Sequence, residues 1–299
     1  MTTDPLLPLA DLPGVADAVA RARAACEELR WHEAFRRKWR EVRAESTVRS
    51  ARASAALEGA GVPLELLRDA ARGATEIPAD GQGRLAFGAL RATAEVERLL
   101  PALGARSTPA LPPFGQLLAR LHTAAAAGLA DAPDPAATGV AHLDDVGRPR
   151  GHASPRDLTG LGPSVSGPQV SARLDLLGEL VRTSTAPALV VAAVAHGELL
   201  ALRPFVIGSG VVARATFRLL VASRGLDPTG SVVADVAWLG SVNGYLGAAA
   251  GFATGTPVGS RPGWWPARTR CGSAPTRVGR SRTPCSPGGS RARRALLSR

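Results

Sequence analysis

The stretch "HGELLALRPFVIGSGVVARATFRLL", residues 196–220, decides the fold and contains the candidate site. An apolar run at helical spacing ends at a Pro-Phe pair, and a Gly-Ser-Gly turn at 208–210 precedes a second apolar run. This pattern predicts two helices joined by a short loop. Backbone N–H groups at a helix start favour an anion, and Arg214, one turn into the second helix, is placed to bind a phosphate. The alternative is a plain turn between two core helices.

The rest of the chain also has a helical composition. It has 299 residues, of which 45% are hydrophobic but only 4% aromatic, and Ala and Leu dominate. Such a core suits packed helices better than strands. Alternating strand patterns are nearly absent, so we expect an all-α helical bundle. The segment 12–43 is expected to form one or two helices. Further expected helices lie at 45–61 with Ser46 as N-cap, 63–73, 83–101, 112–129, 170–184, 187–202, 211–224 and 231–252.

One long segment lacks any helical period. Residues 131–169 are rich in Pro, Gly, Asp and Ser, which predicts an irregular loop before the central helices. Compact domains keep loops of this length mainly for function or as disordered segments. His142 and His152 lie in it, and either could approach a site. His122 and His196 lie in apolar helical patterns instead, so we expect them to be buried core residues.

The C-terminal tail, residues 251–299, has a different composition. It contains ten arginines and no acidic residue, so it accounts for nearly all of the net charge of +11. The tail is predicted to be disordered. A basic arm for nucleic acid is one interpretation, and a folded module is another. We favour a third, a G/C-rich coding sequence read out of frame after about Pro257, because shifted codons of that kind encode Arg, Pro, Gly, Ser, Trp and Cys.

Several function classes find no support in the sequence. The three cysteines, Cys26, Cys271 and Cys285, form no metal-binding or disulfide pattern. The N-terminus lacks the basic and apolar regions of a signal peptide. The longest apolar run, 186–202, contains His196 and Glu198 and is shorter than a membrane span. We therefore expect a cytoplasmic protein without a membrane segment.

Two short motifs resemble those of the Fic family. "RPFVIGSGVVAR" is similar to the signature HPFx(D/E)GNGRxxR, and "SAALEG" is similar to the inhibitory motif (S/T)xxxE(G/N). The signature matches are Pro204, Phe205, Gly208, Gly210 and Arg214, and the inhibitory-motif matches are Ser54, Glu58 and Gly59. The resemblance covers residues 45–250. It implies an N-terminal helical region, 1–110, carrying the inhibitory-type helix 45–61, then a Fic-like core, 111–250, with the irregular loop as its flap.

The resemblance implies a known chemistry and also its loss. Fic proteins mostly transfer AMP from ATP to a hydroxyl group of a target protein, using a histidine base, an acidic magnesium ligand and phosphate-binding arginines. Here Arg203 occupies the histidine position, Ile207 the acidic position, Ser209 the asparagine position and Val211 the first arginine position. Arginine stays protonated, so it cannot be the base, and we assign no catalytic residue.

What remains of the motif predicts binding and regulation. Gly208, Ser209, Gly210 and Arg214 are the candidate phosphate-binding residues, with ATP as the expected ligand and neither Mg²⁺ nor another metal expected. The resemblance implies that Glu58 pairs with Arg214, although Glu58 could instead face solvent. Three alternatives stay open: a live enzyme with non-standard chemistry, a helical interaction protein, and a nucleic-acid module using the tail. The target protein and any homo-oligomer are not identified by the sequence.

Overall fold

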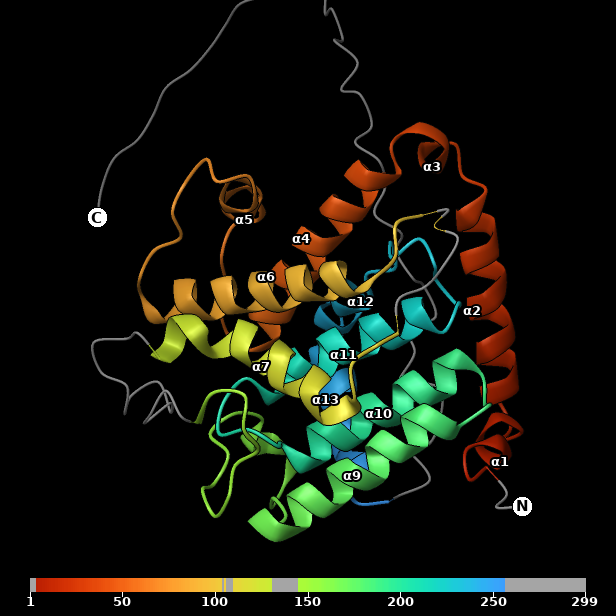
Figure 1. The fold of residues 1–299 in the computed structure, drawn as a ribbon, viewed down its shortest axis with the longest axis vertical. Helices are drawn as coiled ribbons and strands as arrows, with labels where there is room; N and C mark the ends of the chain where they lie inside the picture. The colour runs from red at the N-terminus through yellow and green to blue at the C-terminus, as the bar shows by residue number, and fades with distance from the viewer. Residues whose placement is uncertain (1–3, 104, 106–109, 131–144, 256–299) are drawn as a thin grey trace, which may run out of the picture.

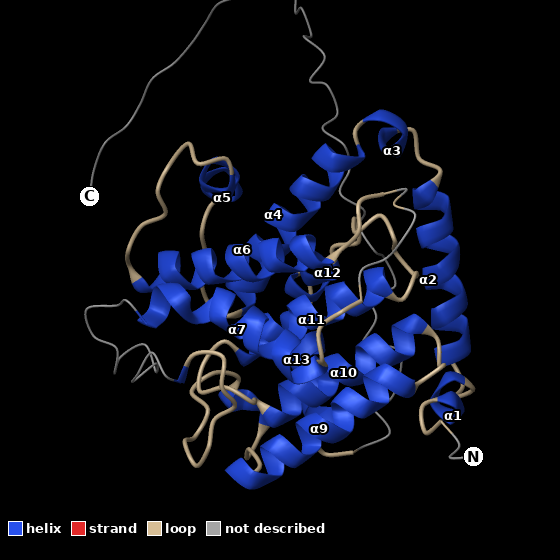
Figure 2. Ribbon diagram, viewed as in Figure 1, coloured by secondary structure: helices blue, strands red, loops and turns tan. Residues whose placement is uncertain are grey.

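The computed structural model describes residues 4–103, 105, 110–130 and 145–255, and the described part is all-α (Figure 2). No β-strand occurs among these residues. The helices are α1 Leu7–Ala10, α2 Val15–Arg30, α3 Ala34–Arg37, α4 Trp39–Leu57, α5 Leu64–Ala71, α6 Gly81–Leu99, α7 Phe114–Ala130, the 3₁₀ turn η2 Thr159–Leu161, α9 Gly167–Thr183, α10 Ala188–Leu202, α11 Ser209–Ser223, α12 Ala234–Leu239 and α13 Val242–Ala253.

The quoted stretch forms the helix pair at the centre of the bundle (Figure 1). Helix α10 is apolar on nearly all faces, and every residue of α11 from Ser209 to Ala222 is buried. A helix that is buried all round has to be covered by other helices on every side. Here α10, α4, α6 and α7 pack against α11. One hydrophobic cluster runs through these helices. It includes residues of both the expected N-terminal region, 1–110, and the expected core, 111–250.

Helix α4 connects the N-terminal half of the chain to this centre. It packs against α6 and α12 and also contacts α11. Toward its C-terminal end the buried face of α4 consists of small residues, including Ala51, Ser54 and Ala55. The backbones of α4 and α11 can therefore approach closely. Gly59, with φ of +90°, ends the helix in a left-handed conformation that favours glycine. The C-terminal end of α4, with Glu58, is thereby held against the start of α11.

Buried charges on α11 have partners on α4 and α6. Arg218 is 6% exposed and donates to the Glu97 carboxylate at 2.9 Å and to the carbonyl oxygen of Gly230 at 2.7 Å. The same carboxylate lies 2.5 Å from Nε of Arg43 on α4. Removing one member of such a buried group leaves the others unpaired and is costly. This cluster therefore fixes α4, α6 and α11 relative to one another.

Several helix boundaries differ from the sequence prediction. Ser46 is not an N-cap, because α4 begins at Trp39 and the Ser46 hydroxyl donates to the carbonyl oxygen of Val42 at 2.9 Å. The segment 12–43, predicted as one or two helices, contains α2, α3 and the start of α4, with breaks around 31–33 and at Lys38, and the predicted helix 231–252 is broken at 240–241. The loop predicted to reach residue 169 ends earlier, because α9 begins at Gly167.

The C-terminal predictions are only partly covered by the structure. The predicted tail boundary at residue 251 is wrong, because α13 continues to Ala253. The prediction of disorder and the frame-shift interpretation concern residues 256–299, which lie outside the described residues, as do His142 and the first part of the predicted loop. Within the described chain, no helix combines the length and hydropathy that a membrane span requires.

Candidate anion-binding loop

The loop between α10 and α11 is held in one conformation by its own backbone. Gly208 has φ of +84°, in the left-handed region that favours glycine, and is the N-cap of α11. The Ser209 hydroxyl donates to the carbonyl oxygen of Phe205 and accepts from the Phe205 N–H, both at 3.1 Å. Ser209, at the asparagine position, thus stabilises the turn through its side chain. Its hydroxyl bonds to the Phe205 backbone and not to the N–H groups at the start of α11.

His122 on α7 packs against the same loop and bonds to it. Its ring stacks on Phe205 with centroids 3.8 Å apart. Its Nε2 lies 3.0 Å from the carbonyl oxygen of Ile207, and its Nδ1 accepts from the N–H of Gly147 at 2.9 Å. Burial lowers the pKa of His122 to about 4, although the bond to Ile207 opposes this shift. The ring is therefore a neutral brace, and the prediction of a buried core histidine is confirmed.

Arg214 is enclosed by groups from α4. It is 1% exposed, and its Nε donates to the Ser54 hydroxyl at 2.8 Å, while Nη2 donates to the Ser54 carbonyl oxygen at 3.1 Å. Nη2 also lies 2.6 Å from Oε1 of Glu58. Burial alone would lower the pKa of Arg214, but the charge of Glu58 and, more weakly, that of Asp235 raise it above its usual value. The predicted contact between Glu58 and Arg214 is present.

Glu58 also lies directly over the loop. A Cβ atom placed on Gly210 would overlap Oε1 of Glu58 and would approach Nη1 of Arg214 to 3.1 Å. Only glycine at position 210 therefore leaves room for this carboxylate. The solvent-facing alternative for Glu58 is wrong, because its side chain is 9% exposed.

A second carboxyl group, which was not predicted from the sequence, binds the loop. It belongs to Asp157, in the irregular segment before α9. The backbone N–H of Ser209 donates to Oδ2 of Asp157 at 2.7 Å, and the N–H of Gly210 lies near the same carboxyl group. Burial and the charge of nearby Glu58 raise the pKa of Asp157 to about 7, while the backbone N–H groups act in the opposite direction. The start of α11 therefore holds an acidic side chain, which is an anion above pH 7, at the place where a helix terminus favours one.

Arg203 does not point its guanidinium toward these N–H groups. It has φ of +46°, and its Nη1 and Nη2 donate to the carbonyl oxygens of Leu158 and Gly162 at 3.2 and 2.7 Å. Arg150, also buried, donates to the carbonyl oxygens of Leu202 and Arg203. The residue at the histidine position is thus a clamp that holds the segment carrying Asp157.

The position expected to hold a metal ligand offers only a backbone group. Ile207 contributes its carbonyl oxygen, which accepts from His122, and its side chain cannot bind a cation. Val211, at the first arginine position, is buried and apolar. The described part of the chain has no group of three His, Cys, Asp or Glu side chains that could hold a metal ion. The donors at the loop suit an oxyanion, and the residues at the magnesium position do not suit magnesium.

His196 lies in the core beside Tyr245. His196 is completely buried, its Nε2 lies 3.1 Å from the Tyr245 hydroxyl, and burial and the charge of Arg214 lower its pKa. This confirms that His196 is a core residue. His152 is exposed on the segment before Asp157.

One signal in the sequence could have revealed Asp157. It is the only acidic residue between Asp145 and Asp175, in a segment otherwise rich in Arg, Pro and Gly. A single carboxylate in a basic, irregular segment next to a predicted anion site is a candidate partner for that site. The pairing itself needed the tertiary structure, because Asp157 and Ser209 are 52 positions apart.

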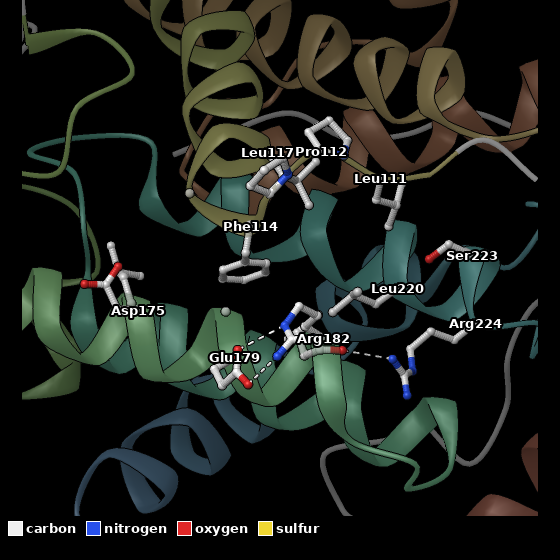
Figure 3. A pocket seen from close by; sticks show the side chains of 15 residues that line it. Leu111, Pro112, Phe114, Leu117, Asp175, Glu179, Arg182, Leu220, Ser223 and Arg224 are labelled. Carbon is white, nitrogen blue, oxygen red and sulfur yellow. Dashed lines mark hydrogen bonds and ion pairs between the residues drawn. The ribbon is translucent and has the colours of Figure 1, made fainter.

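A separate cavity lies at the other end of α11 (Figure 3). Its volume is about 700 Å³, and it lies between the start of α7, the middle of α9 and the end of α11, where Leu220 and Arg224 line it. Glu179 and Arg182 pair with each other along its edge. None of the predicted site residues lines this cavity. At 1.5 Å per residue, α11 separates it from the loop by about 20 Å.

Comparison with known proteins identifies the fold. No protein-family model and no curated protein sequence matches the chain. Among solved structures, a Fic family protein from Desulfovibrio desulfuricans G20 is similar with a TM-score of 0.64 and 16% identity, over 84% of this chain and 70% of that one. Two structures of Fic-1 from C. elegans have TM-scores of 0.49 and 19% identity, over 80% of this chain and 68% of theirs. The chain therefore has an all-α, Fic-like fold.

Proposed function

We propose that this protein is a Fic family member that binds a phosphate-bearing ligand, with ATP as the first candidate, and that it is impaired in AMP transfer. The observation that carries the proposal is the contact of Glu58 and Ser54 with Arg214. An arginine buried beside a phosphate-type helix start binds carboxylate and phosphate oxygens with the same donors. Glu58 is then an internal rival for the phosphate.

Ser54, Glu58 and Gly59 have a regulatory role in this proposal. Ser54 and Glu58 both contact Arg214, and Gly59 ends α4 so that Glu58 lies at its terminus. Withdrawal of the end of α4 would free two donor groups of Arg214. The inhibitory motif is thus proposed to control access to Arg214.

The impairment follows from the residues around the loop. Arg203 cannot accept a proton, and its guanidinium is already bonded to Leu158 and Gly162. Loss of a general base alone slows such reactions by about 100- to 10,000-fold. His122 does not replace it, because both ring nitrogens are bonded to backbone groups. The proposal therefore keeps binding by Gly208, Ser209, Gly210 and Arg214 and assigns no base.

Binding is proposed to be independent of magnesium. The side chain of Ile207 lies at the position of the metal ligand and has no oxygen, so a magnesium ion would have no protein ligand there. The ligand's phosphate charge would instead be balanced by the N–H groups of the loop and by Arg214.

Calorimetry of ATP binding to the full chain tests this proposal. In Glu58→Ala the rival carboxylate is absent, so we expect ATP to bind at least about tenfold more tightly than to the wild type, the equivalent of one charge-assisted hydrogen bond. Glu41→Ala is the matched control, because Glu41 is an exposed acid in the first turn of the same helix. Arg214→Ala should abolish binding.

Removing magnesium with a chelator should leave the affinity for ATP unchanged. Equal affinities for Glu58→Ala and Glu41→Ala would contradict the inhibitory role of Glu58. Binding that requires magnesium would contradict the proposed binding mode.

A further inference from the structure

The anion-binding N–H groups of the loop are occupied by a side chain of the protein itself. Oδ2 of Asp157 accepts from the N–H of Ser209 at 2.7 Å, and the Gly210 N–H lies near the same carboxyl group. These two N–H groups belong to the first turn of a 15-residue helix, where backbone donors have no intrahelical acceptor. The ionised carboxylate has the position and the charge of a ligand's phosphate oxygen.

The charges around Asp157 are a second, independent sign that the place is suited to a larger anion. Arg150 and Arg203 are 6% and 3% exposed. Burial lowers the pKa of both, and the charge of Arg203 lowers that of Arg150 further, while Asp157 opposes the shift in each. Among the described residues, Nε of Arg203 and Oδ1 of Asp157 are buried without a hydrogen-bond partner. One carboxyl group thus lies at a helix start and within electrostatic range of two buried cations.

We propose that Asp157 is an internal substitute for a phosphate group and closes the Ser209 N–H group at the start of α11 to ligands, in addition to the block of Arg214 by Glu58. This inference rests on the proposed function, because it requires that the loop takes a phosphate. Asp157 is then a second side chain, besides Glu58, that competes with the ligand's phosphate. Glu58 occupies Arg214 from α4, and Asp157 occupies the Ser209 N–H group from the segment before α9.

Arg203 has a defined part in this arrangement. Its two donors bind the carbonyl oxygens of Leu158 and Gly162, and the N–H of Arg156 donates to the carbonyl oxygen of Val206 at 2.7 Å. The residues on both sides of Asp157 are therefore attached to the α10–α11 loop. Arg203, at the histidine position, therefore cannot act as a base. It also holds the segment that places Asp157 where it competes with the ligand.

The test is calorimetry with inorganic pyrophosphate and the full chain, in magnesium-free buffer at a pH well above 7, where the Asp157 carboxyl is ionised. The variants are Asp157→Ala, Asp157→Asn, Glu58→Ala and the double variant of Asp157→Ala with Glu58→Ala. Asp175→Ala is the matched control, because Asp175 is an exposed acid on α9 whose removal changes the net charge equally. Asp157→Asn keeps the side-chain shape and removes only the charge, so a folding defect in Asp157→Ala does not decide the result.

We expect Asp157→Ala to bind pyrophosphate at least about tenfold more tightly than Asp175→Ala, because one charge-assisted hydrogen bond no longer competes. Asp157→Asn should fall between them, and the double variant should bind most tightly. Tighter binding by Glu58→Ala but not by either Asp157 variant would overturn this inference and leave the proposed function intact. The absence of pyrophosphate and ATP binding in every variant would overturn both.

Discussion

Oε1 of Glu58 lies 2.6 Å from Nη2 of Arg214, although the two residues are 156 positions apart in the sequence. Their side chains are 9% and 1% exposed. The pair joins the end of α4 to the second turn of α11, and Gly210 in the first turn leaves the space for it. A buried pair of this kind is a strong constraint on the fold, because either partner alone would be an uncompensated buried charge.

Stability measurements on Arg214→Ala test this constraint. The substitution leaves Glu58 buried without its cation and also removes the donors to Ser54. We expect the free energy of unfolding, measured by urea denaturation, to fall by about 3–5 kcal/mol. Arg72→Ala, which removes an exposed arginine paired with Asp69, should change it by less than about 1 kcal/mol. Equal effects of the two substitutions would contradict a buried pair.

Gly210→Ala tests the close approach of Glu58 to the loop. The added Cβ would overlap Oε1 of Glu58, so we expect the substitution to lower the thermal midpoint of unfolding. In the Glu58→Ala background the same substitution should lower the midpoint much less, because the overlapping oxygen is absent there. Gly61→Ala is a suitable control, because a Cβ at position 61 meets no atom within 4 Å. A loss that Glu58→Ala does not reduce would place the obstacle elsewhere in the loop.

The raised pKa of Asp157 gives the protein a specific dependence on pH. With a folded pKa of about 7 and an ordinary value of 3.8, the folded state holds a proton that the unfolded state releases above pH 4. Asp157 therefore stabilises the fold fully below pH 4, and this contribution is lost as the pH rises toward 7. Compared with the wild type, Asp157→Asn should gain relative stability as the pH rises from 4 to 7.

His122 acts in the opposite direction over an overlapping range. Its folded pKa of about 4 lies below its ordinary value of 6.5, so its contribution to stability is lost as the pH falls from 6.5 to 4. The difference between Asp157→Asn and the wild type, measured by urea denaturation at each pH, isolates Asp157 from this effect. A difference that stays constant from pH 4 to 7 would show that Asp157 has an ordinary pKa.

The sequence predicted the architecture well where helical periods are bounded by Gly and Pro. Helices α6, α7, α10 and α11 lie within a few residues of their expected positions, and α10 and α11 meet at the expected loop. The contact between Glu58 and Arg214 was predicted from the motif alone. Ser46 was misjudged, because a serine that bonds to the carbonyl oxygen four residues earlier is compatible with a helix interior.

The internal occupant of the loop could not be predicted in the same way. Asp157 lies in a segment without a period, and its place depends on backbone bonds from Arg150 to Pro204 and from Arg156 to Val206. Local propensity says nothing about such long-range bonds. The sequence therefore predicted the loop and the contact of Glu58 with Arg214, but not the carboxyl group that accepts from the N–H of Ser209.

Arg203→His tests whether arginine at the histidine position is sufficient to explain the proposed impairment of AMP transfer. We expect no labelling of the protein by ATP radiolabelled at the α-phosphate, because Ile207 still supplies no metal ligand, and Glu58 and Asp157 still occupy Arg214 and the loop.

In the same variant we also expect faster backbone hydrogen exchange in residues 156–162, since the bonds from Arg203 to Leu158 and Gly162 are lost. Arg182→His, an exposed arginine on α9, should leave this exchange unchanged. Labelling by Arg203→His alone would show that only the base is missing, and unchanged exchange would show that Arg203 does not hold the segment that carries Asp157.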